Sequence, residues 1–180
     1  MSSPRLAGFT IVELMITLAI IGIALVFASP NIATFIKNYR ITTQANGLLA
    51  DFQLARNNSV TQGLPVSVCA SSDTANASPT CSTTTWSSGR IVFTDANGNG
   101  TVDAGDTLLR ISEPLSGSNS LVAANLTSGG IIQFRPSGMP AGITGSTIAT
   151  FTLCDDRPGP FGRVVNVSLT GRASVATATC

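Results

Sequence analysis

Residues 9–29 form an uninterrupted hydrophobic stretch near the start of the chain. Of these 21 residues, 16 are hydrophobic, and Glu13 is the only charged one. At about 1.5 Å per residue, a helix of this length spans roughly 31 Å, the thickness of a membrane's hydrocarbon core. A charged side chain costs about 2.5–3.5 kcal/mol at the centre of such a helix and less near its end. The pattern predicts a membrane-spanning helix in which Glu13 needs a partner.

Residues 30–62 change from wholly hydrophobic to amphipathic. Hydrophobic residues recur here at intervals of three and four, which is the helical period. They are Ile32, Phe35, Ile36, Tyr39, Leu48, Leu49, Phe52 and Ala55. The pattern predicts that one helix continues through Pro30, which should kink it, and that its apolar stripe packs on a sheet. Gly63 and Pro65 should end the helix.

The remaining segment, residues 63–180, has the pattern of short β-strands. Runs rich in β-branched and other apolar residues alternate with turns that contain glycine or proline. The expected strands are 66–70, 90–94, 107–112, 120–125, 131–135, 148–154, 163–168 and 174–177. A Ser- and Thr-rich segment, 71–88, should form a surface loop closed by Trp86. We therefore expect an α+β fold in which a long N-terminal helix packs on an antiparallel β-sheet domain.

Composition narrows the function classes. Hydrophobic residues make up 43% of the chain and charged residues only 11%, against a usual charged share of about 25%. Much of this excess lies in residues 9–29. The chain has no histidine, which excludes a Ser-His-Asp or Cys-His nucleophile pair and a histidine-ligated zinc. The net charge of +1 argues against coating of nucleic acid by bulk attraction. We do not expect an enzyme.

Residues 8–14 read Gly-Phe-Thr-Ile-Val-Glu-Leu. A cleaved secretory signal peptide fits poorly, because the apolar stretch is too long and contains Glu13. The segment resembles the type IV prepilin signature. This resemblance implies that a prepilin peptidase cuts after Gly8, that residues 1–8 are a leader, and that Phe9 becomes an N-methylated N-terminus. It also implies that Glu13 pairs with the N-terminal amine of a neighbouring subunit, which compensates a buried carboxylate.

Further segments resemble one particular family among the proteins with the type IV prepilin signature. Residues 48–60 and 65–69 are similar to the helix end and first strand of the GspH/FimT family of minor pilins and pseudopilins, and segments 89–93, 95–110 and 162–172 also resemble it. The resemblance implies a pilin-like arrangement of the elements and a minor pilin in the assembly or initiation of a type IV pilus, in a tip or priming complex. Other major and minor pilins would be its partners. The alternatives are a DNA-binding minor pilin for natural transformation and a type II secretion pseudopilin.

The four cysteines fit an oxidising compartment. Arg5 precedes the apolar stretch, so the positive-inside tendency places the C-terminal domain outside the inner membrane, in the periplasm and then in the extracellular pilus. Four cysteines allow three pairings. Spacing favours Cys69 with Cys81 and Cys154 with Cys180. Neither pair has the C-x-x-C spacing of a metal site.

Residues 95–106 fit the register of a calcium-binding loop. Positions 1, 3, 5, 9 and 12 of such a loop carry oxygen side chains, and position 6 is the glycine of a sharp turn. The oxygen-bearing residues are Asp95, Asn97, Asn99, Asp103 and Asp106. The segment departs from the pattern because position 12 is not glutamate and because it lies between predicted strands. The alternative is a long β-hairpin in which these residues form turns.

Arg157, Arg163 and Arg172 lie in the last quarter of the chain. Guanidinium groups on loops are suited to phosphate, so these residues are candidates for DNA binding. Some FimT-like relatives bind DNA through a C-terminal Gly-Arg-x-Arg loop, but here the second arginine is replaced by Ser174. The alternative is a solvated surface on which Asp155 or Asp156 pairs with an arginine.

Overall fold

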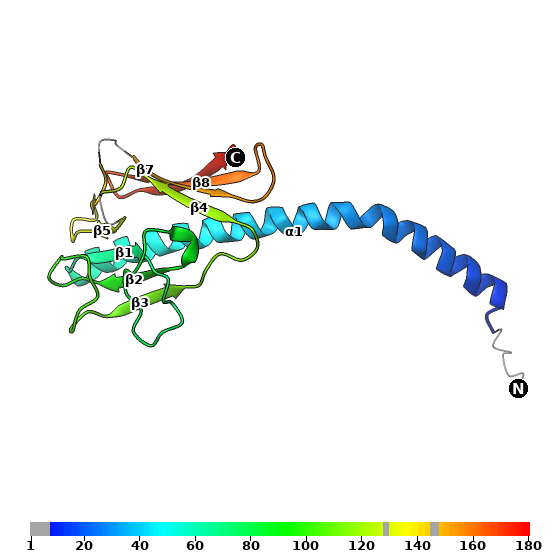
Figure 1. The fold of residues 1–180 in the computed structure, drawn as a ribbon, viewed down its shortest axis with the longest axis horizontal. Helices are drawn as coiled ribbons and strands as arrows, with labels where there is room; N and C mark the ends of the chain where they lie inside the picture. The colour runs from blue at the N-terminus through cyan, green and yellow to red at the C-terminus, as the bar shows by residue number, and fades with distance from the viewer. Residues whose placement is uncertain (1–7, 128–129, 145–147) are drawn as a thin grey trace, which may run out of the picture. The chain divides into compact units, whose positions relative to one another are not determined.

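The computed structural model of the protein describes residues 8–127, 130–144 and 148–180 (Figure 1). The predicted leader, residues 1–8, therefore lies outside the described residues except for Gly8. The chain forms two compact units, Met1–Asn38 and Tyr39–Cys180. Each unit has its own structure, and the residues with candidate chemistry are divided between them.

Helix α1, Ile11–Gln62, begins with a side-chain cap and ends at a glycine. The Thr10 hydroxyl accepts a hydrogen bond from the backbone N–H of Glu13 at 3.2 Å, which makes Thr10 the N-cap. At the other end, Gly63 has φ of 68° and donates its N–H to the carbonyl of Ser59 at 3.1 Å. The prediction of one long helix ended by Gly63 is confirmed, and a kink at Pro30 stays a prediction.

The first unit exposes its hydrophobic side chains. Among them, Phe9 is 80% exposed, Ile11 79% and Leu25 64%. Within the described residues, no helical stretch combines the length and the hydropathy that a membrane span requires. The membrane-spanning role of residues 9–29 stays a prediction.

The second unit contains two antiparallel sheets (Figure 1). The first has the strand order β3-β2-β1-β5-β6 and the second the order β4-β7-β8-β9. The first sheet consists of β1 Val66–Ala70, β2 Arg90–Thr94, β3 Leu108–Ser112, β5 Ile132–Phe134 and β6 Pro140–Ala141. The second consists of β4 Ser120–Ala124, β7 Ile148–Cys154, β8 Gly162–Ser168 and β9 Ala173–Ala178.

The predicted packing of a long helix on an antiparallel β-sheet domain is confirmed, and both sheets pack on the same stretch of α1. Phe52 of the helix contacts Phe134 of the first sheet and Phe151 of the second, with ring centroids 6.5 and 4.9 Å away. Trp86, in the short 3₁₀ helix η1 (Trp86–Ser88), packs edge-on against Phe151 at 4.7 Å. A helix that packs against two sheets buries more apolar area than a helix that packs on one face of a single sheet.

The apolar stripe of α1 divides into a buried and an exposed part. Its fully buried members follow the helical period and are Ile41, Ala45, Leu48, Phe52 and Ala55. The members that precede them are exposed, namely Ile32, Phe35, Ile36 and Tyr39. The predicted packing on a sheet is therefore confirmed for the later part of the stripe and wrong for the earlier part. The exposed residues leave apolar surface available to another molecule.

Candidate functional site

The residues of the N-terminal motif are accessible in the structure. Gly8, Phe9 and Glu13 are all exposed, and Glu13 occupies the third position of α1. A carboxylate in the first helical turn interacts favourably with the positive end of the helix dipole. The surrounding side chains, such as Val12 and Leu14, are hydrophobic and more than half exposed. The motif therefore presents one acidic group on an apolar surface.

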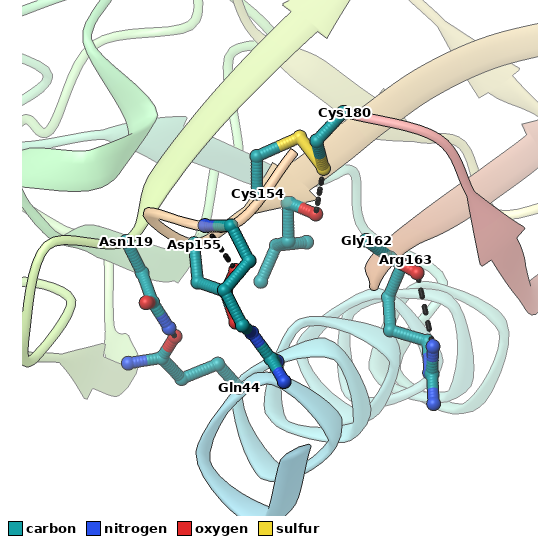
Figure 2. A network of polar contacts seen from close by, with 9 residues as sticks. Gln44, Asn119, Cys154, Asp155, Gly162, Arg163 and Cys180 are labelled. Atoms are coloured by element: carbon teal, nitrogen blue, oxygen red, sulfur yellow. Dashed lines mark hydrogen bonds and ion pairs between the residues drawn. A yellow bond between two sulfur atoms is a disulfide. The ribbon is translucent and has the colours of Figure 1, made fainter. Parts of the chain in front are cut away.

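The cysteines form the two disulfides that sequence spacing favours. Cys69 pairs with Cys81, and the closed loop holds the Ser- and Thr-rich segment against the end of β1. Cys154 pairs with Cys180 and ties the second residue after β9 to the end of β7 (Figure 2). Both bonds fix a loop or terminal segment to an interior strand of a sheet, which is a structural role.

Asp73 organises the disulfide-closed loop. Its carboxylate accepts hydrogen bonds from the hydroxyls of Ser71, Thr80 and Ser82 and from the backbone N–H of Thr80. These bonds, with that from Ser71 the strongest, lower the pKa of Asp73 from 3.8 to about 2. The loop is thus held by a disulfide and by one ionised carboxylate.

Asp95, at the start of the candidate calcium loop, is satisfied by protein donors. Asp95 is fully buried, and its carboxylate accepts bonds from the hydroxyl of Ser67, the amide of Gln133 and the backbone N–H of Gly100 at 2.7–2.9 Å. These bonds fix the start of the hairpin to β1 and β5. The side chain faces the sheet and acts as a turn residue there.

The other residues of the candidate loop bond to one another. The carboxylate of Asp103 accepts bonds from the amides of Asn97 and Asn99, and the first of these bonds contributes most to a lowered pKa of Asp103. Asp106 accepts bonds from the backbone of Ala96 and Asp103. Among the described residues, no group of three or more acidic, cysteine or histidine side chains is arranged to hold a metal ion. These contacts fit the hairpin alternative, and calcium binding stays a prediction.

The three candidate arginines do not form one cluster. Arg163 lies in β8 opposite Thr177, whereas Arg172 follows the turn at the far end of the β8–β9 hairpin, where its carbonyl accepts a bond from Ser168. The six residues from 163 to 168 are separated by five steps, which correspond to about 17 Å of extended strand. A single phosphate group therefore cannot contact both guanidinium groups.

Arg157 has an acidic partner, as the alternative interpretation expected. Its guanidinium binds the carboxylate of Asp155 at 2.5 and 2.9 Å, and its central carbon lies 4.3 Å from the centroid of the Phe161 ring. The hydrogen bond to Asp155 raises the pKa of Arg157. Figure 2 shows Asp155 beside the Cys154–Cys180 disulfide, with Arg163 on a separate strand. The pairing with Asp155 reduces the positive potential that Arg157 offers to DNA.

Sequence reasoning missed a buried charge network between α1 and the first sheet. The Asp51 side chain is 1% exposed and accepts bonds from Arg90 at 2.5 Å, Arg110 at 3.0 Å and the hydroxyl of Ser112 at 3.0 Å. Asp51 comes three residues after Leu48 and therefore falls on the apolar side of the helix. This position of Asp51 in the sequence could have predicted a buried ion pair, because a buried carboxylate requires a cation as partner.

The fold, the apolar N-terminal segment and Glu13 together define a pilin-like subunit, and family comparisons agree. The profile of the prokaryotic N-terminal methylation motif matches residues 4–29, and that of type II transport protein GspH matches residues 44–171. The second match covers more than half of the chain, which therefore belongs to the GspH family. The family takes its name from a protein of type II transport.

Two solved structures share the fold. The type IV minor pilin FimU of Pseudomonas aeruginosa (strain PAO1) matches with a TM-score of 0.57 and 21% identity over 79% of this chain and 92% of that chain. The minor pseudopilin EpsH from the Type 2 Secretion System of Vibrio cholerae matches with a TM-score of 0.53 and 11% identity over 76% and 96%. The predicted α+β, pilin-like fold class is confirmed. No curated protein matches the chain.

Proposed function

We propose that this protein is a minor pilin that takes part in the assembly or initiation of a type IV pilus, in a priming or tip complex. It would be held in the inner membrane by residues 9–29, with the remainder in the periplasm until it enters the extracellular filament. The observation that carries the proposal is Glu13, an acidic side chain in the first turn of α1, among exposed apolar side chains and close to Phe9. Family membership supports the same role.

Glu13 would act in docking. After removal of residues 1–8, the amine of Phe9 becomes a cation at the start of the helix. In a bundle of such helices, the carboxylate of Glu13 on one subunit and the amine on another would meet in a low-dielectric environment. There, an unpaired charge costs about 3–5 kcal/mol, so a correctly staggered neighbour is favoured over a misaligned one.

Glu13→Ala tests this mechanism in a strain that produces the full chain. We expect normal insertion in the membrane and loss of assembled pili, because the amine of the neighbouring subunit is left unpaired. Pili are counted by electron microscopy and the protein is quantified in membrane fractions. Thr17→Ala is the matched control, since Thr17 is also an exposed polar residue of the same helix and bonds only to the carbonyl of Leu14 in its own turn. Normal piliation by the Glu13 variant would contradict the mechanism.

Leader removal is tested separately. The mature protein is expected to begin at N-methylated Phe9, and a bulky replacement of Gly8 should leave residues 1–8 attached. Intact-mass spectrometry of protein from membranes measures both. A mature chain that begins elsewhere would contradict the proposed leader boundary.

A role as a type II secretion pseudopilin is the second candidate. It is supported by the likeness to EpsH, of which this chain covers 96%. Deletion of the gene followed by assays of piliation and of exoprotein secretion separates the two roles. DNA binding is not proposed, because Arg163 and Arg172 lie at opposite ends of a hairpin and Arg157 is paired with Asp155.

A further inference from the structure

The two sheets of the second unit have four edges, and the structure protects three of them. Unprotected edges pair with other chains, and proteins prevent this with charges, proline, bulges, short strands or a covering segment. In the first sheet, edge strand β3 carries Arg110 and pairs across a register shift, and edge strand β6 has two residues, one of them Pro140. In the second sheet, the edge of β4 is covered by η1, because the N–H of Leu121 donates to the hydroxyl of Ser87 at 2.9 Å.

Strand β9 lacks these protections. It has six residues, Ala-Ser-Val-Ala-Thr-Ala, without charge or proline, and pairs with β8 in an unbroken register from Ala173 to Ala178. In the part of the chain that the structure describes, no strand lies beyond it (Figure 1). A regular, uncharged edge of this length is a template for an added strand.

The outward-facing backbone groups of β9 follow from two hydrogen bonds that flank it. The carbonyl of Arg172 accepts from the N–H of Ser168, and the N–H of Cys180 donates to the carbonyl of Gly159. Both flanking residues therefore direct their backbone groups toward β8. Since backbone groups alternate along an antiparallel strand, those of Ala173, Val175 and Thr177 point away from β8. These three residues offer N–H and C=O groups to a partner.

A polar depression lies at the start of this edge. It has a volume of about 310 Å³ and is lined by Gln53, Arg56, Asn57, Gly171, Arg172 and Ala173. Arg56 bonds to the carbonyls of Gly138 and Thr170, which fixes its guanidinium beside the hairpin turn. Two arginines and no acidic residue line the depression, so it is complementary to a carboxylate.

We propose that β9 binds an extended segment of a second polypeptide by antiparallel strand addition. The segment is uncharged along β9 and carries an aspartate or glutamate near its C-terminal end, where it passes Arg172 and Arg56. Backbone hydrogen bonds to Ala173, Val175 and Thr177 supply affinity, and the carboxylate fixes register and direction. This surface is separate from Glu13. Strand addition to β9 can therefore be disproved while the proposed docking of the helices through Glu13 remains valid.

The test uses the full chain in detergent micelles and a synthetic probe. The probe is a peptide of about six residues, alternating threonine and valine and ending in glutamate, with both termini blocked. Backbone amide NMR shifts are followed up to about 1 mM peptide. We expect saturable shift changes at Ala173, Val175 and Thr177. A probe that ends in glutamine should bind about tenfold more weakly, and Arg172→Gln should abolish that difference.

Thr177→Pro removes one outward N–H while leaving the bonds to β8, because Thr177 is exposed and faces away from that strand. It should weaken binding about tenfold, whereas the matched control Thr177→Ala, which keeps the N–H, should bind as the unaltered protein. Arg172→Gln gives an independent result if the proline disturbs β9. The proposal is overturned by the absence of shift changes in β9 at about 1 mM, by equal binding of the two Thr177 variants when the β8 amides are unchanged, or by equal binding of the two probes.

Discussion

At the scale of single residues, the stability of the second unit depends on the buried carboxylate of Asp51. Arg90, whose side chain is 6% exposed, and Arg110, which is 45% exposed, both bind its carboxylate. Removal of one partner from a buried ion pair leaves the other charge uncompensated, and this costs more than the pair itself contributes. The three charges thus connect α1 to β2 and β3 with a specific geometry.

Asp51→Asn should lower the free energy of unfolding by about 3–5 kcal/mol, because Arg90 is then buried without a negative partner. Urea denaturation of the full chain in micelles, followed by tryptophan fluorescence of the single Trp86, measures this. Arg110→Gln is the comparison, and its cost should be about 1 kcal/mol or less because its side chain is half exposed. Equal costs for the two variants would contradict this account.

Asp73 predicts a pH dependence of stability. Its pKa in the folded protein is lowered to about 2, from an ordinary value of 3.8, by the hydroxyl of Ser71 and the other donors of the loop. A lowered folded pKa means that the stabilisation is fully present above the ordinary value and is lost as the pH falls from about 4 to about 2. Asp73→Asn should show a smaller loss of stability over that interval. Carbon-13 NMR of the carboxyl group gives the pKa directly, and a value near 4 would refute the prediction.

At the scale of elements, the β8–β9 turn is fixed by its contact with the β5–β6 turn. Gly171 has φ of 77°, and a Cβ placed on it would lie 2.0 Å from the carbonyl oxygen of Gly138. Arg56 donates to that same carbonyl, so helix and both turns meet at one point. No side chain fits at Gly171 without displacement of the backbone.

Gly171→Ala should therefore destabilise the protein by more than Gly63→Ala does. Both glycines have similar positive φ values, 77° and 68°, but nothing lies within 4 Å of a Cβ at Gly63. The Gly63 variant should cost about 1 kcal/mol from backbone strain alone, and the Gly171 variant about 2–4 kcal/mol. Thermal unfolding of the two variants side by side measures the difference. Similar melting temperatures of the two variants would show that the β8–β9 turn accommodates a Cβ at Gly171 at little cost in stability.

Local patterns identified most elements, whereas pairing of distant elements was not predictable. Strands β1, β2 and β7 have the predicted bounds, because turns with glycine, proline or Asx residues limit each run. The two-residue strand β6 was missed because it contains Pro140 and has no apolar run. The division into two sheets was missed because alternation identifies a strand without specifying its neighbour.

The same distinction applies to the candidate sites. The motif of Gly8, Phe9 and Glu13 is a local string, and it was predictable from the residues alone. The partners of Asp51 come from strands 39 to 61 residues away, so only the fold reveals them. The separation of Arg163 from Arg172 depends on hairpin register, which composition does not contain.

At the scale of the whole molecule, the two disulfides stabilise different parts of the second unit. Cys69–Cys81 closes a separation of 12 residues, and Cys154–Cys180 closes one of 26. Loop-entropy arguments predict that each bond contributes about 3 kcal/mol, slightly more for the longer loop. Paired Cys→Ser variants should lose about this much stability in urea denaturation. Unchanged stability of either variant would mean that the unfolded chain is already restricted.

The placement of Phe52 between the sheets also bears on how the chain reaches its native state. An isolated bridge pairs Leu126, which follows β4, with Ile143, which follows β6, and residues of both sheets share one apolar cluster with α1. The helix precedes every strand in the sequence, so it emerges before them during synthesis. Each sheet can then condense on an existing template. The part of α1 that carries Phe52 is therefore in place as a scaffold before either sheet that packs on it.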